Sequence, residues 1–174
     1  MNGSEAPSLS FYPSLVRRIS RPRDWKEPLE ARNAATASRV LQTDGGQPVS
    51  MWLIGDAVEL RRTAIALNGT KAEGSLGEAL DFLAVHPEEL VNVGAIVQET
   101  PADVDCEAVQ GLHRDVTFPK DSALKLCTTL INGNRELQRC TRGNMKEAKR
   151  LAEKEGCFVF QHSTHCECGA TRDR

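Results

Sequence analysis

The sequence predicts an α+β fold: two successive β-helix-helix-β units form one four-stranded, ferredoxin-like sheet with helices on one face, and an N-terminal helix precedes them. Three observations lead to this prediction. Residues 48–55 (PVSMWLIG) are a short apolar run typical of a strand. Amphipathic segments with helical spacing follow it, and a similar order of segments begins again near residue 113.

The first 26 residues are predicted to be a flexible arm rich in arginine, serine and proline. Residues 1–23 carry four arginines against a single acidic residue, Glu5. Organelle transit peptides share this composition, but Pro13 and Pro22 would interrupt the amphipathic helix that a transit peptide forms. Residues 27–41 are predicted to be the N-terminal helix, and the glycine pair after Asp44 would end it.

The first unit covers residues 48–100. Its strand leads into a helix over residues 56–69, for which Asp56 provides an N-cap and Gly69 an end. A second helix is predicted over residues 75–90, because Ser75 and Glu78 have capping-box spacing and apolar residues follow at helical spacing. Residues 91–97 (VNVGAIV) would close the unit as a strand.

The second unit covers residues 113–164 and repeats this order, with a strand over 114–118, helices over 121–133 and 144–156, and a strand over 157–161. Aligning the units sets Leu60 with Leu124 and Leu67 with Ile131. A duplicated module and two unrelated segments of the same order both account for these matches. We therefore predict one domain over residues 27–162, with a possible internal repeat, and a tail over residues 163–174.

Composition is typical of a soluble chain of one domain. Hydrophobic residues make up 40% of the 174 residues and the formal net charge is -2, so the balance is neither that of a disordered chain nor that of a strongly basic nucleic-acid binder. No apolar run approaches the roughly 20 residues that cross a bilayer. We expect a cytoplasmic protein with reduced cysteines and no membrane contact, or an organellar protein if the arm is a transit peptide.

Potential ligands for a soft metal cluster near the C-terminus, at His162, His165, Cys166 and Cys168. Neutral imidazoles and thiolates are the ligands that zinc prefers, so zinc is the cofactor that this segment suggests. Adjacent residues such as His165 and Cys166 rarely reach one ion together. A complete site would therefore take a further ligand from elsewhere in the chain, for which the candidates are His113, Cys127, Cys140 and Cys157.

Three other interpretations of this segment stay open. The apolar run 157–160 followed by Cys166 is similar to the strand and loop that deliver the reactive cysteine of thioredoxin-like proteins, and this resemblance implies a functional thiol. Residues 162–164 (His-Ser-Thr) resemble the His-x-Thr motif of two-histidine phosphoesterases, which implies acid–base chemistry with a second motif near His113. The third interpretation is a polar tail whose side chains have no joint role.

No phosphate-binding glycine loop, nucleophile elbow or His-Glu-x-x-His motif occurs in the sequence, so motifs do not decide whether the chain is an enzyme. A basic run extends from Arg135 to Lys154, and several of its residues would share one face of a helix. Such a face suits phosphates or an acidic protein surface. The predicted contact residues are Arg139, Arg142, Lys146, Lys149 and Arg150.

We therefore expect a small binding or regulatory module that engages nucleic acid or an acidic protein. Its contacts would come from the basic helix, the open sheet face and the arginine-rich arm. The alternative is a small zinc-dependent or thiol-dependent enzyme that uses the C-terminal histidines and cysteines.

Overall fold

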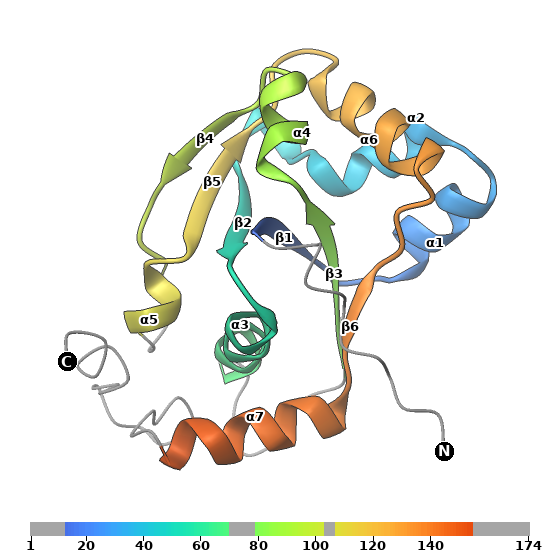
Figure 1. Cartoon of the computed structure of the whole chain (residues 1–174). Coiled ribbons are helices and arrows are strands. Elements are labelled where there is room, and N and C mark those ends of the chain that lie inside the picture. Colours follow the sequence, from blue (N-terminus) through green and yellow to red (C-terminus); the bar gives the residue numbers. More distant parts are fainter. Residues whose placement is uncertain (1–12, 70–78, 103–106, 155–174) are drawn as a thin grey trace.

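Six β-strands form one antiparallel sheet in the computed structural model, which describes residues 13–69, 79–102 and 107–154 (Figure 1). The strands are β1 (Ser14–Ile19), β2 (Val49–Ile54), β3 (Leu80–Val85), β4 (Ile96–Glu99), β5 (His113–Thr117) and β6 (Gln138–Cys140). Their order across the sheet is β4-β5-β2-β1-β3-β6. The α+β class is confirmed, and the sheet has six strands in place of the predicted four.

Seven α-helices and two short 3-10 helices accompany the sheet in the described ranges. None of these helices is long and apolar enough to cross a membrane. The α-helices are α1 (Arg23–Glu30), α2 (Ala34–Ala37), α3 (Ala57–Gly69), α4 (Pro87–Asn92), α5 (Glu107–Gln110), α6 (Ser122–Asn132) and α7 (Arg142–Lys154). The 3-10 helices are η2 (Ser38–Leu41) and η3 (Asp44–Gly46).

The strand β1 lies inside the segment that was expected to be a flexible arm. It occupies the middle of the sheet, where Leu15 pairs with Leu53 of β2 on one side and with Val85 of β3 on the other. Its side chains alternate between two covered faces: Leu15 and Ile19 are buried on one face and Val16 is buried on the other. These residues therefore belong to the core of the sheet and not to an arm.

The largest local difference from the predicted elements concerns residues 75–90, which were expected to form one helix. Leu80–Val85 instead form β3, in which all six residues are buried, and α4 begins only at Pro87. β3 pairs with β1 and β6 and is covered on both faces, which explains its nearly continuous apolar sequence. Such a short run carries no period that separates a strand from a helix.

Most of the other predicted elements are present with shifted ends. The matching pairs are 48–55 with β2, 56–69 with α3, 114–118 with β5, 121–133 with α6 and 144–156 with α7. The strand expected over 91–97 begins later, as β4, and the helix expected over 27–41 is divided into α1, α2 and η2. Asn33 starts α2, since its side chain accepts a hydrogen bond from the N–H of Thr36. The strand expected over 157–161 lies outside the described residues.

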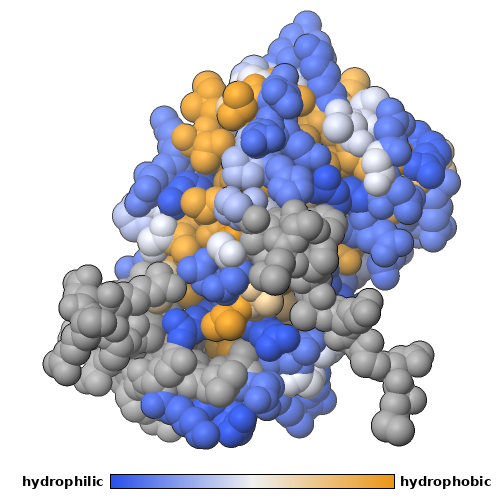
Figure 2. Space-filling view, viewed as in Figure 1, coloured by the Kyte–Doolittle hydropathy of each residue, from blue (hydrophilic) through white to orange (hydrophobic). Residues whose placement is uncertain are grey.

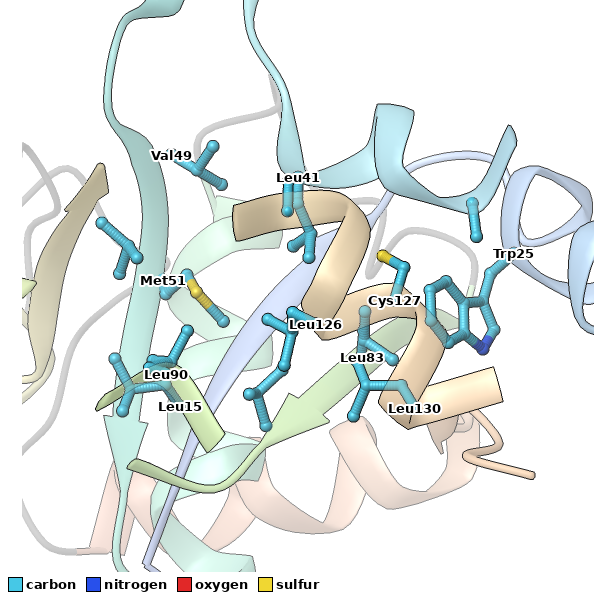
Figure 3. Close-up of a cluster of buried hydrophobic side chains, with 14 of the residues drawn as sticks. Leu15, Trp25, Leu41, Val49, Met51, Leu83, Leu90, Leu126, Cys127 and Leu130 are labelled. Carbon is cyan, nitrogen blue, oxygen red and sulfur yellow. The ribbon is translucent and has the colours of Figure 1, made fainter. Parts of the chain in front are cut away.

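Helices cover both faces of the sheet (Figure 1). The side chains of β3 alternate between the two faces. Phe82 and Ala84 pack in a cluster with α3, α5 and α7, whereas Leu83 and Val85 pack in a second cluster with α1, α2, α4 and α6. Figure 3 shows the second cluster, in which Leu126 of α6 lies among the side chains of the strands. In the described ranges, the prediction of helices on one face and an open second face is therefore wrong.

The two aligned units place their first helices on opposite faces of the sheet. Leu60 of α3 is 4% exposed, whereas its aligned counterpart Leu124 of α6 is 39% exposed. Leu67 and Ile131 are both buried, but in the clusters of opposite faces. Because copies of one module would bury matched residues in the same way, this arrangement lends no support to the internal repeat, which stays a prediction.

Candidate functional site

The helix α7 carries the predicted basic face. It packs against α3, and Met145 anchors it because that side chain is fully buried in the cluster that the two helices share. Arg142, Lys146 and Arg150 are exposed at positions i, i+4 and i+8, so they follow one side of the helix. Figure 2 shows a hydrophilic surface along α7, at the bottom of the view. Lys149 also belongs to α7, but its side chain is not among those that the structure describes.

One acidic side chain pairs with this face. The Nη2 atom of Arg150 lies 3.0 Å from Oε1 of Glu147, and both side chains are more than half exposed. Exposed pairs of this kind contribute about 0–1 kcal/mol, so Glu147 only weakly opposes contact between Arg150 and an anionic partner. Among the described residues, the basic face therefore keeps most of its charge available to solvent.

The fifth predicted contact residue, Arg139, does not join the α7 face. It lies on β6 directly opposite Asp81 of β3, and its Nη1 atom is 3.8 Å from Oδ1 of Asp81. Both side chains line a pocket between α1, β3 and the segment that leads from α6 to β6. The structure therefore brings Arg142, Lys146 and Arg150 together and places Arg139 at a different site.

Asp81 is a candidate residue that the sequence analysis did not select. It is the only charged residue of β3 (LDFLAV), and it is 4% exposed. Its signal in the sequence is a carboxylate within an otherwise apolar strand, because burial of a charge is costly unless a partner compensates it. A carboxylate on a helix needs no role beyond solubility, so the helix predicted over residues 75–90 concealed that signal.

The predicted metal ligands His162, His165, Cys166 and Cys168 all lie outside the described residues, so zinc binding there stays a prediction. Of the residues that were expected to complete the site, Cys127 and Cys140 are buried in clusters on opposite faces of the sheet. They cannot both contact one ion. Within the described ranges, no group of three histidine, cysteine, aspartate or glutamate side chains is placed to hold a metal.

Contacts with neighbouring strands fix the buried His113 ring. Its Nδ1 atom lies 3.0 Å from Oγ1 of Thr100 and 3.0 Å from the carbonyl oxygen of Thr100. The ring centroid lies 5.3 Å from that of Trp52, at an interplanar angle of 67°, and Nε2 lies 3.9 Å from Oδ1 of Asp115. These contacts join β5 to β2 and to the residue after β4, which gives His113 a structural role.

The two cysteines in the described ranges are unreactive by environment. Burial raises the pKa of the Cys127 thiol to about 12. Burial also raises the pKa of Cys140 to about 11; the positive charge of Arg61 acts against this rise, and the negative charge of Asp81 adds to it. Since the thiolate is the nucleophile and the metal ligand, these residues do not supply the thiol chemistry considered for the C-terminal segment.

We expect Cys127 and Cys140 to resist alkylation by iodoacetamide at about pH 8 in the folded protein and to react once urea unfolds it. Mass spectrometry of the resulting peptides separates these two thiols from the other four. Rapid modification of either residue in the folded protein would contradict its burial.

The same two thiols also give the stability a pH dependence. The ordinary thiol pKa is 9.0, and the folded values are about 12 for Cys127 and about 11 for Cys140. The protonated thiols therefore stabilise the folded state fully below pH 9, and this contribution is lost as the pH rises through the folded values. Urea titrations between these limits, with Cys127→Ala as the comparison, measure the loss.

Known proteins provide no guide to either site. The chain matches no protein-family model, no curated protein and no solved structure. The basic face of α7 and the pocket at Asp81 are therefore interpreted from their own residues.

Proposed function

We propose that this chain is a small binding or regulatory module that engages an anionic partner, nucleic acid or an acidic protein, through the exposed basic face of α7. The observation that supports the proposal is the row formed by Arg142, Lys146 and Arg150 on a helix that the buried Met145 fixes to the core. Because the helix is anchored, the row keeps its spacing when phosphates or carboxylates approach.

The proposal makes no use of a free sheet face, since helices cover both faces in the described ranges. It also does not depend on the total charge, which is formally -2. Recognition of an anion would be local to α7, and we expect it to weaken steeply as salt is added.

The test is to change Arg142, Lys146 and Arg150 together to glutamine. The probes are a fluorescent single-stranded RNA of about 20 nucleotides and a fluorescent duplex DNA of about 20 base pairs. We expect the variant to bind them at least tenfold more weakly than the parent protein does. We also expect the slope of log K against log salt concentration to become shallower by about 2–3. Fluorescence anisotropy at several salt concentrations measures both quantities. A polyglutamate peptide tested in parallel separates an acidic-protein partner from nucleic acid.

The matched control replaces one exposed arginine and two exposed lysines elsewhere, Arg39, Lys120 and Lys125, with glutamine. It carries the same change in net charge on other elements, so we expect less than about a threefold change in affinity. Equal losses in the two triple variants, or no binding of any of these probes by the parent protein, would refute a role for α7.

The zinc-dependent or thiol-dependent enzyme considered above is not proposed further, because no observation in the described ranges favours it. Its residues His162, His165, Cys166 and Cys168 lie beyond those ranges. The cytoplasmic location likewise stays a prediction from composition.

A further inference from the structure

The pocket at Asp81 has the dimensions of a small-molecule site. Its volume is about 520 Å³, and ligand pockets generally span roughly 300–1,000 Å³. Trp25 and Asp81 are both buried in its wall, and the half-buried Leu29 and Leu137 add apolar surface. Arg139 lines it as an exposed residue at the edge. The pocket therefore combines an apolar wall and one buried charge, Asp81, with accessible charged side chains around it: Lys26, Glu30, Arg32, Glu136 and Arg139.

Hydrogen bonds between its walls hold the pocket open in one shape. Nε1 of Trp25 donates to the carbonyl oxygen of Arg135 at 2.8 Å, which ties α1 to the segment after α6. Arg32 donates to the carbonyl oxygen of Ile131, which ties the end of α1 to α6. Nη1 of Arg135 donates to the carbonyl oxygen of Ala84 at 2.9 Å, which ties the same segment to β3. A ligand would thus enter a preformed site.

The carboxylate of Asp81 lacks a hydrogen bond in the described part of the chain. Its charged partner is Arg139, whose Nη1 atom lies 3.8 Å from Oδ1, beyond hydrogen-bond distance. The Arg139 side chain is 54% exposed and that of Asp81 is 4% exposed. Buried carboxylates are normally both paired and hydrogen-bonded, so Asp81 has acceptor capacity that the described residues do not satisfy.

The missing interaction defines the chemistry of the ligand. A cationic donor, such as an ammonium group, would supply the hydrogen bonds that Asp81 lacks. The guanidinium of Arg139, which is half exposed, would take an anionic group on the same molecule. Because the two protein charges are only 3.8 Å apart, the two ligand charges must also be close neighbours, as they are when both are carried by one carbon atom.

We infer that the pocket binds a free α-amino acid with an apolar side chain. The ammonium group donates to Asp81, the carboxylate contacts Arg139, and the side chain packs on Trp25, Leu29 and Leu137. This site is separate from the basic face of α7, because Arg139 lies on β6 and is not part of the row on α7. Failure of one proposal would therefore leave the other untouched.

The first experiment measures ligand binding to the full chain. L-leucine, L-methionine and L-phenylalanine at about 10 mM are expected to raise the melting temperature, and calorimetry then gives their affinities. N-acetyl-L-leucine, which lacks the ammonium charge, and L-leucinamide, which lacks the carboxylate, are expected to bind at least tenfold more weakly than L-leucine. Absence of any shift, or equal binding of L-leucine and its N-acetyl derivative, would overturn the inference.

The second experiment uses variants. Asp81→Asn is expected to weaken L-leucine binding about 10- to 100-fold, since hydrogen bonds to a charged group are lost, and Arg139→Gln is expected to weaken it by a smaller factor. Asp121→Asn is the matched control, because Asp121 is an exposed aspartate that does not line this pocket. An affinity that is the same in Asp81→Asn and in the control would also overturn the inference.

A stability measurement distinguishes a binding role of Asp81 from a structural one. If the carboxylate is kept for a ligand, Asp81→Asn removes a buried charge without a hydrogen bond, and the urea midpoint of the ligand-free protein stays level or rises. Arg139→Gln instead leaves that charge without its cation, so its midpoint falls. A fall in Asp81→Asn as large as that in Arg139→Gln would show that the pair is structural and would contradict the inference.

Discussion

Replacing Trp25 with alanine is expected to lower the free energy of unfolding by about 3–5 kcal/mol, because a large, fully buried ring leaves a cavity. The change also leaves the carbonyl oxygen of Arg135 without the indole donor that lies 2.8 Å away. Urea denaturation followed by far-ultraviolet circular dichroism measures the loss.

Trp25→Phe is the control for this prediction. It keeps an aromatic ring in the cluster but removes the indole N–H, so the expected loss is smaller than that of the alanine variant. Trp25 belongs to the segment of residues 1–26 that was expected to be an arm, where a substitution would leave stability unchanged. A loss below about 1 kcal/mol in Trp25→Ala would therefore contradict the packing of α1 against the sheet.

The second large effect is expected at Arg135, where methionine in place of arginine should cost about 3 kcal/mol. Nη2 of Arg135 lies 2.9 Å from Oε1 of Glu89, and both side chains are largely buried, with exposures of 17% and 19%. Nη1 also donates to the carbonyl oxygen of Ala84 at 2.9 Å. Removing the cation leaves the largely buried carboxylate of Glu89 and the carbonyl oxygen of Ala84 without this donor.

A double-mutant cycle with Glu89→Gln isolates the pairwise part of this effect. In the capping box of α4, the Glu89 carboxylate accepts a hydrogen bond of 2.8 Å from the backbone N–H of His86. Glutamine at position 89 keeps a side-chain oxygen that can accept the same hydrogen bond. We expect the double variant to be more stable than the sum of the single losses implies, with a coupling energy of about 1–3 kcal/mol. Strict additivity would show that the ion pair contributes nothing beyond its separate contacts.

The elements that sequence reasoning placed correctly are those with a strong local signal. α3 and α6 have apolar residues at helical spacing, and β2 is a short apolar run closed by a turn. β1 was missed because Arg17 and Arg18 interrupt its apolar pattern. The structure accommodates Arg17 within the sheet, where burial lowers its pKa and its Nη1 atom donates to the carbonyl oxygen of Ser50 at 3.0 Å. That hydrogen bond joins β1 to β2, so no local pattern in the sequence indicates it.

The candidate sites were predictable to different degrees. The row on α7 follows from helical spacing alone, so its residues Arg142, Lys146 and Arg150 were recognised. The pocket at Asp81 depends on the pairing of β3 with β6, and the assignment of residues 75–90 to a helix excluded that pairing. Predicting a site of this second kind requires knowledge of the strand order in the sheet. Short apolar runs in the sequence carry no local information about that order.

The central place of β1 has a consequence for how the chain is made. A ribosome completes β1 before either of its neighbours exists, since Leu15 pairs with Leu53 and with Val85. Contacts so distant in sequence form slowly, and until they form, both edges of β1 are available to other nascent chains. Deletions within residues 14–19 should therefore lower the yield of folded protein, because they remove the strand that joins β2 to β3 in the sheet.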